Sequence, residues 1–448
     1  MFIYTPFLNL RWKPAAFRIQ LTKIIYVLFI LSILTSTVGM KPAAAVGPCD
    51  SPANEIIAEN CKTGNPSSEW DISGAGDSTI QGFATDISVN RGGTINFKVD
   101  TVASSFQIKI YRLGYYNGLG ARLIDTIPDT ATTATTQPAC TNGGSPDFLV
   151  DCGGWSVSAS WTAVDRTYDP DINAVSGLYI ARLERTDGTS GASHIPFIVR
   201  DDDGNSDLLF QTSDTTWQAY NGYGGYSLYA APNHAHKVSY NRPFSTRSNA
   251  PEDYFMNAEY PMLRWLERNG YDVSYFTDVD SDRYGSEILE HKVFLSVGHD
   301  EYWSAGQRTA VEAARDAGVH LAFFSGNEIY WKTRWEPSTA DGGNTPYRTL
   351  VSYKEGDAQG SEHYDCLGNF NCDPDPDTWT GLWRQNQTGH DGGQPENSLS
   401  GQISWGDATS AIQVPASATG LRFWRDTGMT GATTLTYGTL GYEFDWEQ

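Results

Sequence analysis

Residues 291–335 read HKVFLSVGHDEYWSAGQRTAVEAARDAGVHLAFFSGNEIYWKTRW, and this stretch decides the fold of the 448-residue chain. The apolar run VFLSV, stopped by Gly298, is typical of a strand buried on both faces. A helix is predicted next, because Ser304 and Gln307 form a capping-box pair and Gly318 follows the apolar stripe. A second apolar run, VHLAFF, comes directly afterwards. This order predicts a right-handed parallel crossover, whose ligand sites lie beyond the carboxyl ends of its strands.

Each of these two strands ends in a polar corner, HDE at 299–301 and SGNE at 325–328. Alternate side chains of an extended segment point the same way, so His299 and Glu301 share a face and Asp300 points elsewhere. A histidine and a carboxylate at a strand end can bind a metal or act as a general base. The alternative is that these groups only cap helices and form salt bridges. The second corner, expected beside the first, favours a functional site.

Outward from this stretch, the chain divides into two regions of different periodicity. Residues 69–200 hold at least six runs that alternate apolar and polar residues between turns, which predicts an antiparallel β-sandwich domain. The turn-rich DDDGNSD at 201–207 marks the boundary. Residues 205–448 alternate strand and helix patterns and predict a three-layer α/β domain with a parallel sheet. An irregular insertion is expected at about 336–400, with short strands after it. The fold class is therefore multidomain, β plus α/β.

The N-terminus has the pattern of a secretory signal. Basic residues precede the apolar run IIYVLFILSIL, and alanines at 43–45 offer a cleavage site, so residues 1–45 are interpreted as a signal peptide. An uncleaved anchor is the alternative, and no later segment is apolar enough for a stable membrane span. Residues 46–68 are expected to be a loop-like leader. The protein is predicted to be secreted or extracytoplasmic.

The six cysteines fall in three pairs of near neighbours. Local disulfides in an oxidising compartment are the simplest interpretation, although spacing does not fix connectivity. No C-x-x-C pair is present, which argues against a zinc ribbon or a redox motif. The expected pairs are Cys49 with Cys61, Cys140 with Cys152, and Cys366 with Cys372.

The net charge is -22, and loss of the five basic residues in the signal segment would bring it to -27. A surface this acidic repels nucleic acid and anionic membranes. The 14 tryptophans and 24 tyrosines suit a sugar-facing protein, but filling of strands and core is the plainer interpretation.

Other catalytic and binding motifs are weak. There is no G-x-S-x-G elbow, and Ser325 follows Phe324 rather than a glycine, so acyl-enzyme chemistry is disfavoured. DVDSD at 278–282 resembles the start of a calcium loop, but Leu289 occupies the position of the bidentate glutamate. This segment and DPDPD at 373–377 are therefore interpreted as solvated acidic turns.

Four motifs in order resemble one known family. VFLSVGHDEYWS with AFFSGNE, TWQAYN at 216–221 and SGLYIARL at 176–183 are similar to the large subunit of N,N-dimethylformamidase and its secreted relatives, from about Glu69 to the C-terminus. The resemblance implies a mononuclear iron held by two tyrosines and one glutamate. By motif these ligands would be Tyr179, Tyr220 and Glu301.

The resemblance also implies supporting residues around the iron. His299 and Asn327 would lie near the iron, and Glu443 in LGYEFD is matched to a further acidic residue. With Tyr179 on a sandwich strand, the metal would lie at the seam between the two domains. The chain departs from the resembling enzyme in its export signal and added cysteines, and no small partner subunit is visible in the sequence.

The predicted function is hydrolysis of an amide or a related C-N bond by water activated at the iron, with a small-molecule amide as substrate. The alternative is a secreted carbohydrate-binding or surface protein that keeps the fold without catalysis. A third is a glycosidase that uses Asp300 and Glu328 as its carboxylate pair. No nucleic-acid partner is expected, and a homo-oligomer stays open.

Overall fold

The structure is a computed structural model. It describes residues 47–447 except 135, 146, 165–173, 231–233, 355–372, 376–377, 385–392, 426 and 442. The chain divides into two compact units, Met1–Ala53 and Asn54–Gln448. The predicted signal segment lies outside the described residues. Across the residues that are described, no helix is long and apolar enough to cross a bilayer.

The predicted leader is helical in part, contrary to the expectation of a loop. It holds α2 (Glu55–Asn60) and the first residues of α3 (Ser67–Trp70). The Asn54 side chain accepts a hydrogen bond from the amide of Ile57, so α2 begins with an ordinary N-cap. Helix α2 has only six residues, too few for a helical pattern of apolar residues to be seen in the sequence.

Residues 80–200 form two β-sheets with a common core. One sheet has the order β1-β3-β8 and the other β2-β10-β9-β4-β5. Neighbouring strands are antiparallel except β10 and β2, which are parallel. One hydrophobic cluster takes residues from both sheets, including Ile80, Phe97, Ile108 and Phe197. The bounds are β1 (Ile80–Ala84), β2 (Ser88–Asn90), β3 (Thr94–Thr101), β4 (Phe106–Leu113), β5 (Ala121–Ile127), β8 (Ala159–Thr162), β9 (Gly177–Arg185) and β10 (Ala192–Arg200).

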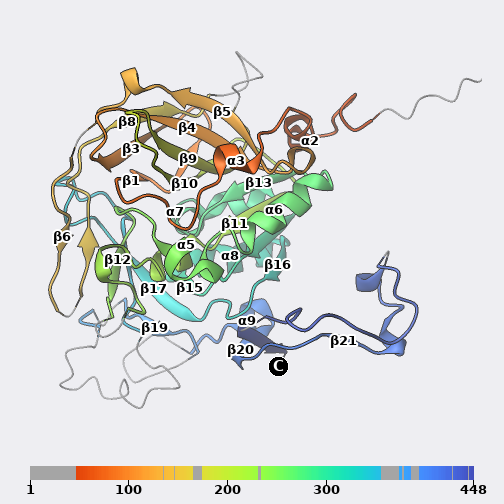
Figure 1. The fold of residues 1–448 in the computed structure, drawn as a ribbon. Helices are drawn as coiled ribbons and strands as arrows, with labels where there is room; N and C mark the ends of the chain where they lie inside the picture. The colour runs from red at the N-terminus through yellow and green to blue at the C-terminus, as the bar shows by residue number, and fades with distance from the viewer. Residues whose placement is uncertain are drawn as a thin grey trace, which may run out of the picture. The chain divides into compact units, whose positions relative to one another are not determined.

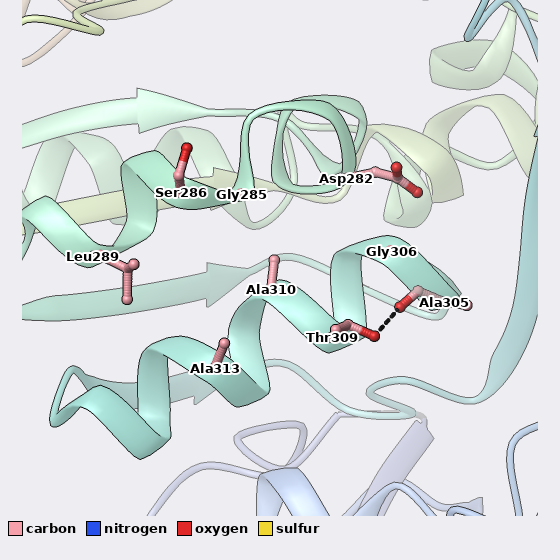
Figure 2. A pocket seen from close by; sticks show the side chains of 9 residues that line it. All are labelled: Asp282, Gly285, Ser286, Leu289, Ala305, Gly306, Thr309, Ala310 and Ala313. Carbon is pink, nitrogen blue, oxygen red and sulfur yellow. Dashed lines mark hydrogen bonds between the residues drawn. The ribbon is translucent and has the colours of Figure 1, made fainter.

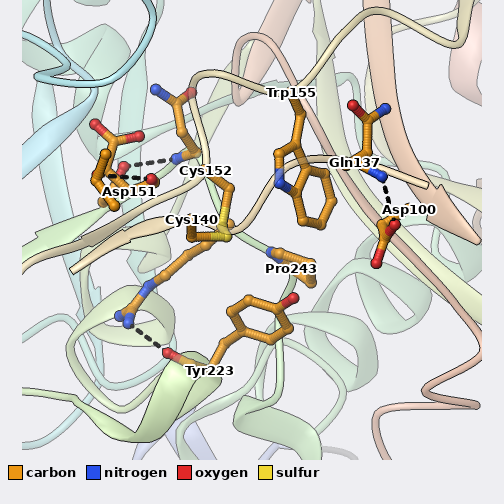
Figure 3. The surroundings of a disulfide bond; sticks show 12 residues. Asp100, Gln137, Cys140, Asp151, Cys152, Trp155, Tyr223 and Pro243 are labelled. Atoms are coloured by element: carbon orange, nitrogen blue, oxygen red, sulfur yellow. Dashed lines mark hydrogen bonds between the residues drawn. A yellow bond between two sulfur atoms is a disulfide. The ribbon is translucent and has the colours of Figure 1, made fainter. Parts of the chain in front are cut away.

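A disulfide closes the short hairpin β6 (Thr141–Asn142) and β7 (Val150–Asp151), between Cys140 and Cys152 as predicted (Figure 3). The backbone amide of Cys152 donates to the carbonyl of Asn241 over 2.7 Å, so the bridge ties this hairpin to the later part of the chain. Cys49 and Cys61 are also disulfide-bonded. The expected Cys366–Cys372 pair lies outside the described residues.

Two strands of residues 291–335 belong to a four-stranded parallel sheet. Figure 1 labels its strands β11, β13 and β16. The order is β13-β11-β14-β16, and every neighbouring pair is parallel, as the buried apolar runs predicted. These strands are β11 (Leu208–Thr212), β13 (Val273–Phe276), β14 (Val293–Val297) and β16 (His320–Phe324). Their carboxyl ends therefore lie along one edge, where a ligand site is expected.

Helices cover both faces of this sheet. Leu263 of α6 (Glu259–Arg268) shares a cluster with Phe210, while Val311 of α8 (Ala305–Ala317) shares another with Phe294. The predicted capping box of α8 is present, and Gly318 ends the helix at a φ of 102°. The predicted combination of β and α/β structure is therefore confirmed in outline.

A second sheet was not predicted. Its order is β12 (Lys237–Ser239), β18 (Thr349–Val351), β17 (Trp331–Glu336) and β15 (Tyr302–Ser304), with β19 (Gly381–Leu382) paired to β17. All of these strands except β17 have only two or three residues, which is too short to show an alternating pattern. The expected irregular insertion thus contributes paired strands and α9 (Asn397–Ser400). Short strands follow, as predicted: β20 (Gln402–Asp407), β21 (Gln413–Val414), β22 (Thr433–Thr434) and β23 (Glu443–Glu447).

The acidic segment DVDSD is neither a solvated turn nor a calcium loop. It lies in helix α7 (Asp278–Arg283), which Thr277 caps, and Asp278 and Asp280 are buried. Asp280 accepts hydrogen bonds from Arg200 and Arg283. The solvated-turn prediction failed because the charges that neutralise Asp280 come partly from a distant strand.

Candidate functional site

The two predicted polar corners lie against each other at the carboxyl edge of the parallel sheet. The amide of Asp300 donates to the Ser325 hydroxyl over 3.1 Å, and the amide of Ile329 donates to the carbonyl of Asp300 over 3.0 Å. Asn327 is buried in the second corner with a φ of 58°, and Ile329 has a φ of 57°. A left-handed β-branched residue is strained, and such strain is often stored at functional corners.

The first corner separates its side chains as the alternation predicted. Nε2 of His299 lies 3.7 Å from Oε2 of Glu301, so these two side chains share a face. Asp300 turns the other way and accepts hydrogen bonds from Gln211 over 2.7 Å and Ser296 over 2.6 Å. Glu301 is buried, and the side chain of His299 is only slightly exposed.

A group of tyrosines surrounds Glu301. The Tyr229 hydroxyl donates to Oε1 of Glu301 over 2.8 Å and lies 3.1 Å from Oε2. The Tyr302 hydroxyl is hydrogen-bonded to that of Tyr229. Tyr220, which caps the end of α4 (Asp214–Ala219), stacks on Tyr229 with ring centroids 4.0 Å apart. Trp331 completes the group by donating its indole N–H to Oε1 of Glu301 over 2.9 Å. We call Tyr220, Tyr229, Tyr302 and Glu301 the tyrosine–glutamate cluster.

The environment of the cluster favours neutral phenols in the absence of a cation. Burial raises the pKa of Tyr229 well above its usual value of 10, and the negative charge of Glu301 raises it further. Burial and Glu301 act in the same way on the pKa of Tyr220. A hard cation at this point would reverse the effect, because it favours the ionised form of every oxygen ligand.

The structure does not bring Tyr179 to this cluster, which contradicts its predicted place beside Tyr220 and Glu301. Its hydroxyl donates to the carbonyl of Val175 over 2.7 Å, and its ring packs against Trp161 and Phe197 in the core between the two β-sheets. In β9 its neighbour Leu178 points to the opposite face, toward the parallel sheet. Alternation along the strand therefore places Tyr179 on the inner side of the two β-sheets. Tyr179 thus contributes no metal ligand at the expected seam between the two domains.

Two other predicted residues have a limited description. The backbone of Glu443 begins β23 and pairs with Asp407, but its side chain lies outside the described part of the structure. Asn327 lies in the corner next to Glu328, and its role toward a substrate stays a prediction.

The carboxylate pair proposed for glycoside hydrolysis is buried instead of facing a cleft. Asp300 and Glu328 both have no exposed surface, and both lie within hydrogen-bonding distance of the Ser296 hydroxyl, whose one proton can be donated to only one of them at a time. Burial raises the pKa of Asp300 to about 6. A sugar ring could not enter between two carboxyl groups that share one hydroxyl, which argues against the glycosidase alternative.

The donor set fits the metal that the resemblance implies. Two phenols and a carboxylate are hard oxygen ligands, which suit a hard cation. Among the described residues, no group of three or more His, Cys, Asp and Glu side chains could hold a metal ion. A cation at Glu301 would therefore depend on tyrosine oxygens. Tyr229 is hydrogen-bonded to Glu301, and Tyr220 stacks on Tyr229.

The hollow in Figure 2 lies elsewhere, between α8 and the 3-10 helix η5 (Gly285–Glu290). It has a volume of about 510 Å³, and none of its lining residues belongs to the tyrosine–glutamate cluster. Asp282 is the one charged side chain among them, so this hollow offers little chemistry. Its lining residues are Asp282, Gly285, Ser286, Leu289, Ala305, Gly306, Thr309, Ala310 and Ala313.

Several site residues escaped the sequence analysis. Tyr302 is adjacent to Glu301 and could have been included with the corner, whereas Tyr229 lies in an aromatic run that looks like core. Asp253, which contacts His299 over 2.9 Å, has no local signal at all. The ammonium of Lys354 lies 3.2 Å from the ring centroid of Tyr229, a cation–π contact that sequence spacing could not reveal.

Comparison with known proteins assigns the family. Residues 107–447 match the N,N-dimethylformamidase beta subunit-like, C-terminal family. None of the curated proteins compared matches the chain. Among solved structures, one match is the Pseudomonas fluorescens alkylpurine DNA glycosylase AlkC bound to DNA containing an abasic site analog. It has 15% identity and a TM-score of 0.15, and the match covers 27% of this chain and 30% of that protein. A similarity this low carries no argument about fold or function. The family match includes every residue of the tyrosine–glutamate cluster and spans most of the chain, and the protein belongs to the N,N-dimethylformamidase beta subunit-like family.

Proposed function

We propose that this protein is an exported, metal-dependent hydrolase of amides or related C-N bonds, with iron as its metal. The observation that carries the proposal is the grouping around the buried carboxylate of Glu301: Tyr229 donates to it, His299 lies 3.7 Å from it, and Tyr220 stacks on Tyr229. Membership of the dimethylformamidase-like family and the disulfides support the reaction class and the export, respectively.

In this proposal Tyr220, Tyr229 and Glu301 hold the metal, and Tyr229 replaces Tyr179 as the second phenol. The indole N–H of Trp331 donates to Oε1 of Glu301 and would orient its carboxylate toward the metal. A bound cation would make a water molecule more acidic and polarise the substrate carbonyl.

His299 moves the proton of the reaction. As the water oxygen bonds to the carbonyl carbon, its proton passes to Nε2 of His299. When the C-N bond breaks, the same proton passes to the leaving nitrogen, so the products are a carboxylic acid and an amine. Asn327 would donate its amide N–H to the substrate oxygen, where negative charge develops.

Metal content and amine release test the proposal together. Purified mature protein should hold close to one iron per chain and release amine from simple formamides or amides. Glu301→Gln should reduce the metal below about a tenth of an equivalent and abolish release, since a charged ligand is lost. Glu290→Gln, a change at an exposed position, is the matched control and should leave both unchanged.

Two results would count against the proposal. Wild-type protein with under about a tenth of an equivalent of metal, unchanged in Glu301→Gln, would remove the metal site. Absence of amine release together with binding on a glycan array would favour the carbohydrate-binding alternative.

A further inference from the structure

A buried carboxylate holds the far side of the His299 ring. Oδ1 of Asp253 lies 2.9 Å from Nδ1 of His299, and the side chains are only 3% and 9% exposed. The opposite ring nitrogen, Nε2, lies 3.7 Å from Oε2 of Glu301. The imidazole therefore stands between two carboxylates, one at hydrogen-bonding distance and one beyond it.

This geometry selects one tautomer of the ring. An ionised carboxylate can only accept hydrogen bonds, so the proton of a neutral imidazole must be on Nδ1 for the contact with Asp253 to form. Nε2 then carries the lone pair on the side that faces Glu301. That side is where the proposed reaction needs a proton acceptor.

The position of Asp253 is fixed by the helix that also presents Tyr220. Asp253 ends the 3-10 turn η4 (Pro251–Asp253), and the next residues, Tyr254 and Phe255, are buried against Trp217 of α4. Their ring centroids lie 6.0 and 5.3 Å from that of Trp217. The carboxylate and the tyrosine are thus placed by one packed unit, as a preorganised site requires.

We propose that Asp253 is a positioning residue that fixes His299 in the Nδ1–H tautomer and keeps Nε2 as the proton acceptor of the site. The kinetic part of this inference rests on the proposed function, whereas the tautomer part does not. Asp253 acts through His299 and need not touch the substrate.

The first test is a ¹⁵N NMR spectrum of the histidine ring nitrogens. Protein labelled with ¹⁵N-histidine and treated with a chelator is measured, and the His299 signals are assigned by their loss in His299→Gln. Wild-type protein should show a protonated Nδ1 and an unprotonated Nε2 at a pH where the ring is neutral. Asp253→Asn should lose this preference, because its amide can donate to Nδ1. Glu252→Gln, an exposed neighbour in the same turn, should match the wild type.

The second test separates kcat from KM with an amide substrate. Asp253→Asn should lower kcat by roughly 10² to 10⁴-fold, the range for loss of a correctly oriented general base. KM and metal content should stay within about threefold of wild type, because no ligand of the cluster is removed.

Each outcome decides the inference. A wild-type spectrum with the proton on Nε2 would overturn it even if Asp253→Asn does not fold, and so would Asp253→Asn protein that keeps the wild-type tautomer or the wild-type kcat. If wild-type protein releases no amine, the proposed reaction is wrong, and the spectra alone then judge the role of Asp253.

Discussion

Tyr229 is the residue on which the candidate site depends most. Its hydroxyl contacts both oxygens of Glu301 and the hydroxyl of Tyr302. Its ring stacks on Tyr220 and makes a cation–π contact with the ammonium of Lys354. Removing one oxygen atom would therefore break the polar contacts and leave the ring contacts in place. Few single-atom changes could separate binding of a cation from packing so cleanly.

The first prediction compares two tyrosine-to-phenylalanine changes. Tyr229→Phe should lower the iron content of purified protein by at least about tenfold, because one of the proposed ligands is lost. Tyr179→Phe should keep the iron and instead reduce the free energy of unfolding by about 1–3 kcal/mol, because the buried carbonyl of Val175 loses its donor. Metal analysis and urea unfolding measure the two effects. Loss of iron in Tyr179→Phe alone would restore the original ligand assignment.

Individual residues also mark how far sequence alone could reach. Glu301 and His299 were found because alternation in an extended corner is a local rule. Tyr229 and Asp253 were missed because their place in the site is set by packing between distant segments, which no spacing encodes. The Tyr179 prediction rested on the resemblance alone. It was wrong because alternation along β9 turns this side chain into the core between the two β-sheets.

At the scale of elements, the carboxyl edge of the parallel sheet concentrates buried acids. Asp214 follows β11, Asp278 follows β13 and Asp300 follows β14, and all three have no exposed surface. Asp214 accepts hydrogen bonds from the amide of Asp278 and the hydroxyl of Tyr240, each over 2.8 Å. Because these acids are buried, their protonation affects the stability of the folded state.

The second prediction concerns the pH dependence of that stability. Burial raises the pKa of Asp214 to about 7, above about 3.9 for an unfolded aspartate. The folded state thus holds this proton more tightly, so its stabilising effect is full below about pH 4 and is lost as the pH rises through about 7. Asp214→Asn should remove this contribution.

The difference in free energy of unfolding between wild type and Asp214→Asn should therefore fall by up to ~4 kcal/mol from pH 4 to pH 7. Urea unfolding at several pH values measures it. Asp207→Asn, at an exposed position, is the control, and its difference should vary by less than ~0.5 kcal/mol. A flat profile for Asp214→Asn would show that the acid is ionised throughout.

Elements with strong local signals were predictable, and short ones were not. The bounds of α8 follow from Ser304, Gln307 and Gly318, which act within a few residues of the helix ends. The sheet formed by β15, β17 and β18 was not predicted, because β15 and β18 have only three residues each and carry no readable period. Helix α7 was missed because its acidic residues look solvated until Arg200 is brought next to them.

At the scale of the whole molecule, the β-sheets of residues 80–200 and the parallel sheet share one core. A single hydrophobic cluster includes Leu178 and Ile180 of β9 together with Phe210 and Leu295 of the parallel sheet. The two sequence-predicted regions should consequently unfold together as one cooperative unit. A buried ion pair strengthens the connection, since Arg112 of β4 binds Glu267 of α6 through contacts of 2.7 and 3.0 Å.

The third prediction breaks that ion pair. Glu267→Gln should lower the free energy of unfolding by about 3–5 kcal/mol, because the buried Arg112 loses its counter-charge. Lys292→Gln removes an exposed pair with Asp207 and should cost under ~1 kcal/mol. Urea unfolding followed by fluorescence and by circular dichroism measures both. Two separated transitions in the wild type would contradict the shared core.

The two faces of β9 bear on how this family can diversify. Tyr179 and Ala181 face the core between the two β-sheets, whereas Leu178 and Ile180 face the core shared with the parallel sheet. Successive residues of one strand are therefore constrained by different sets of neighbours. Recombination that joined the β-sheets of one relative to the parallel sheet of another would mismatch every second residue of β9. The protein is not modular at this strand, and its two regions are expected to change in concert.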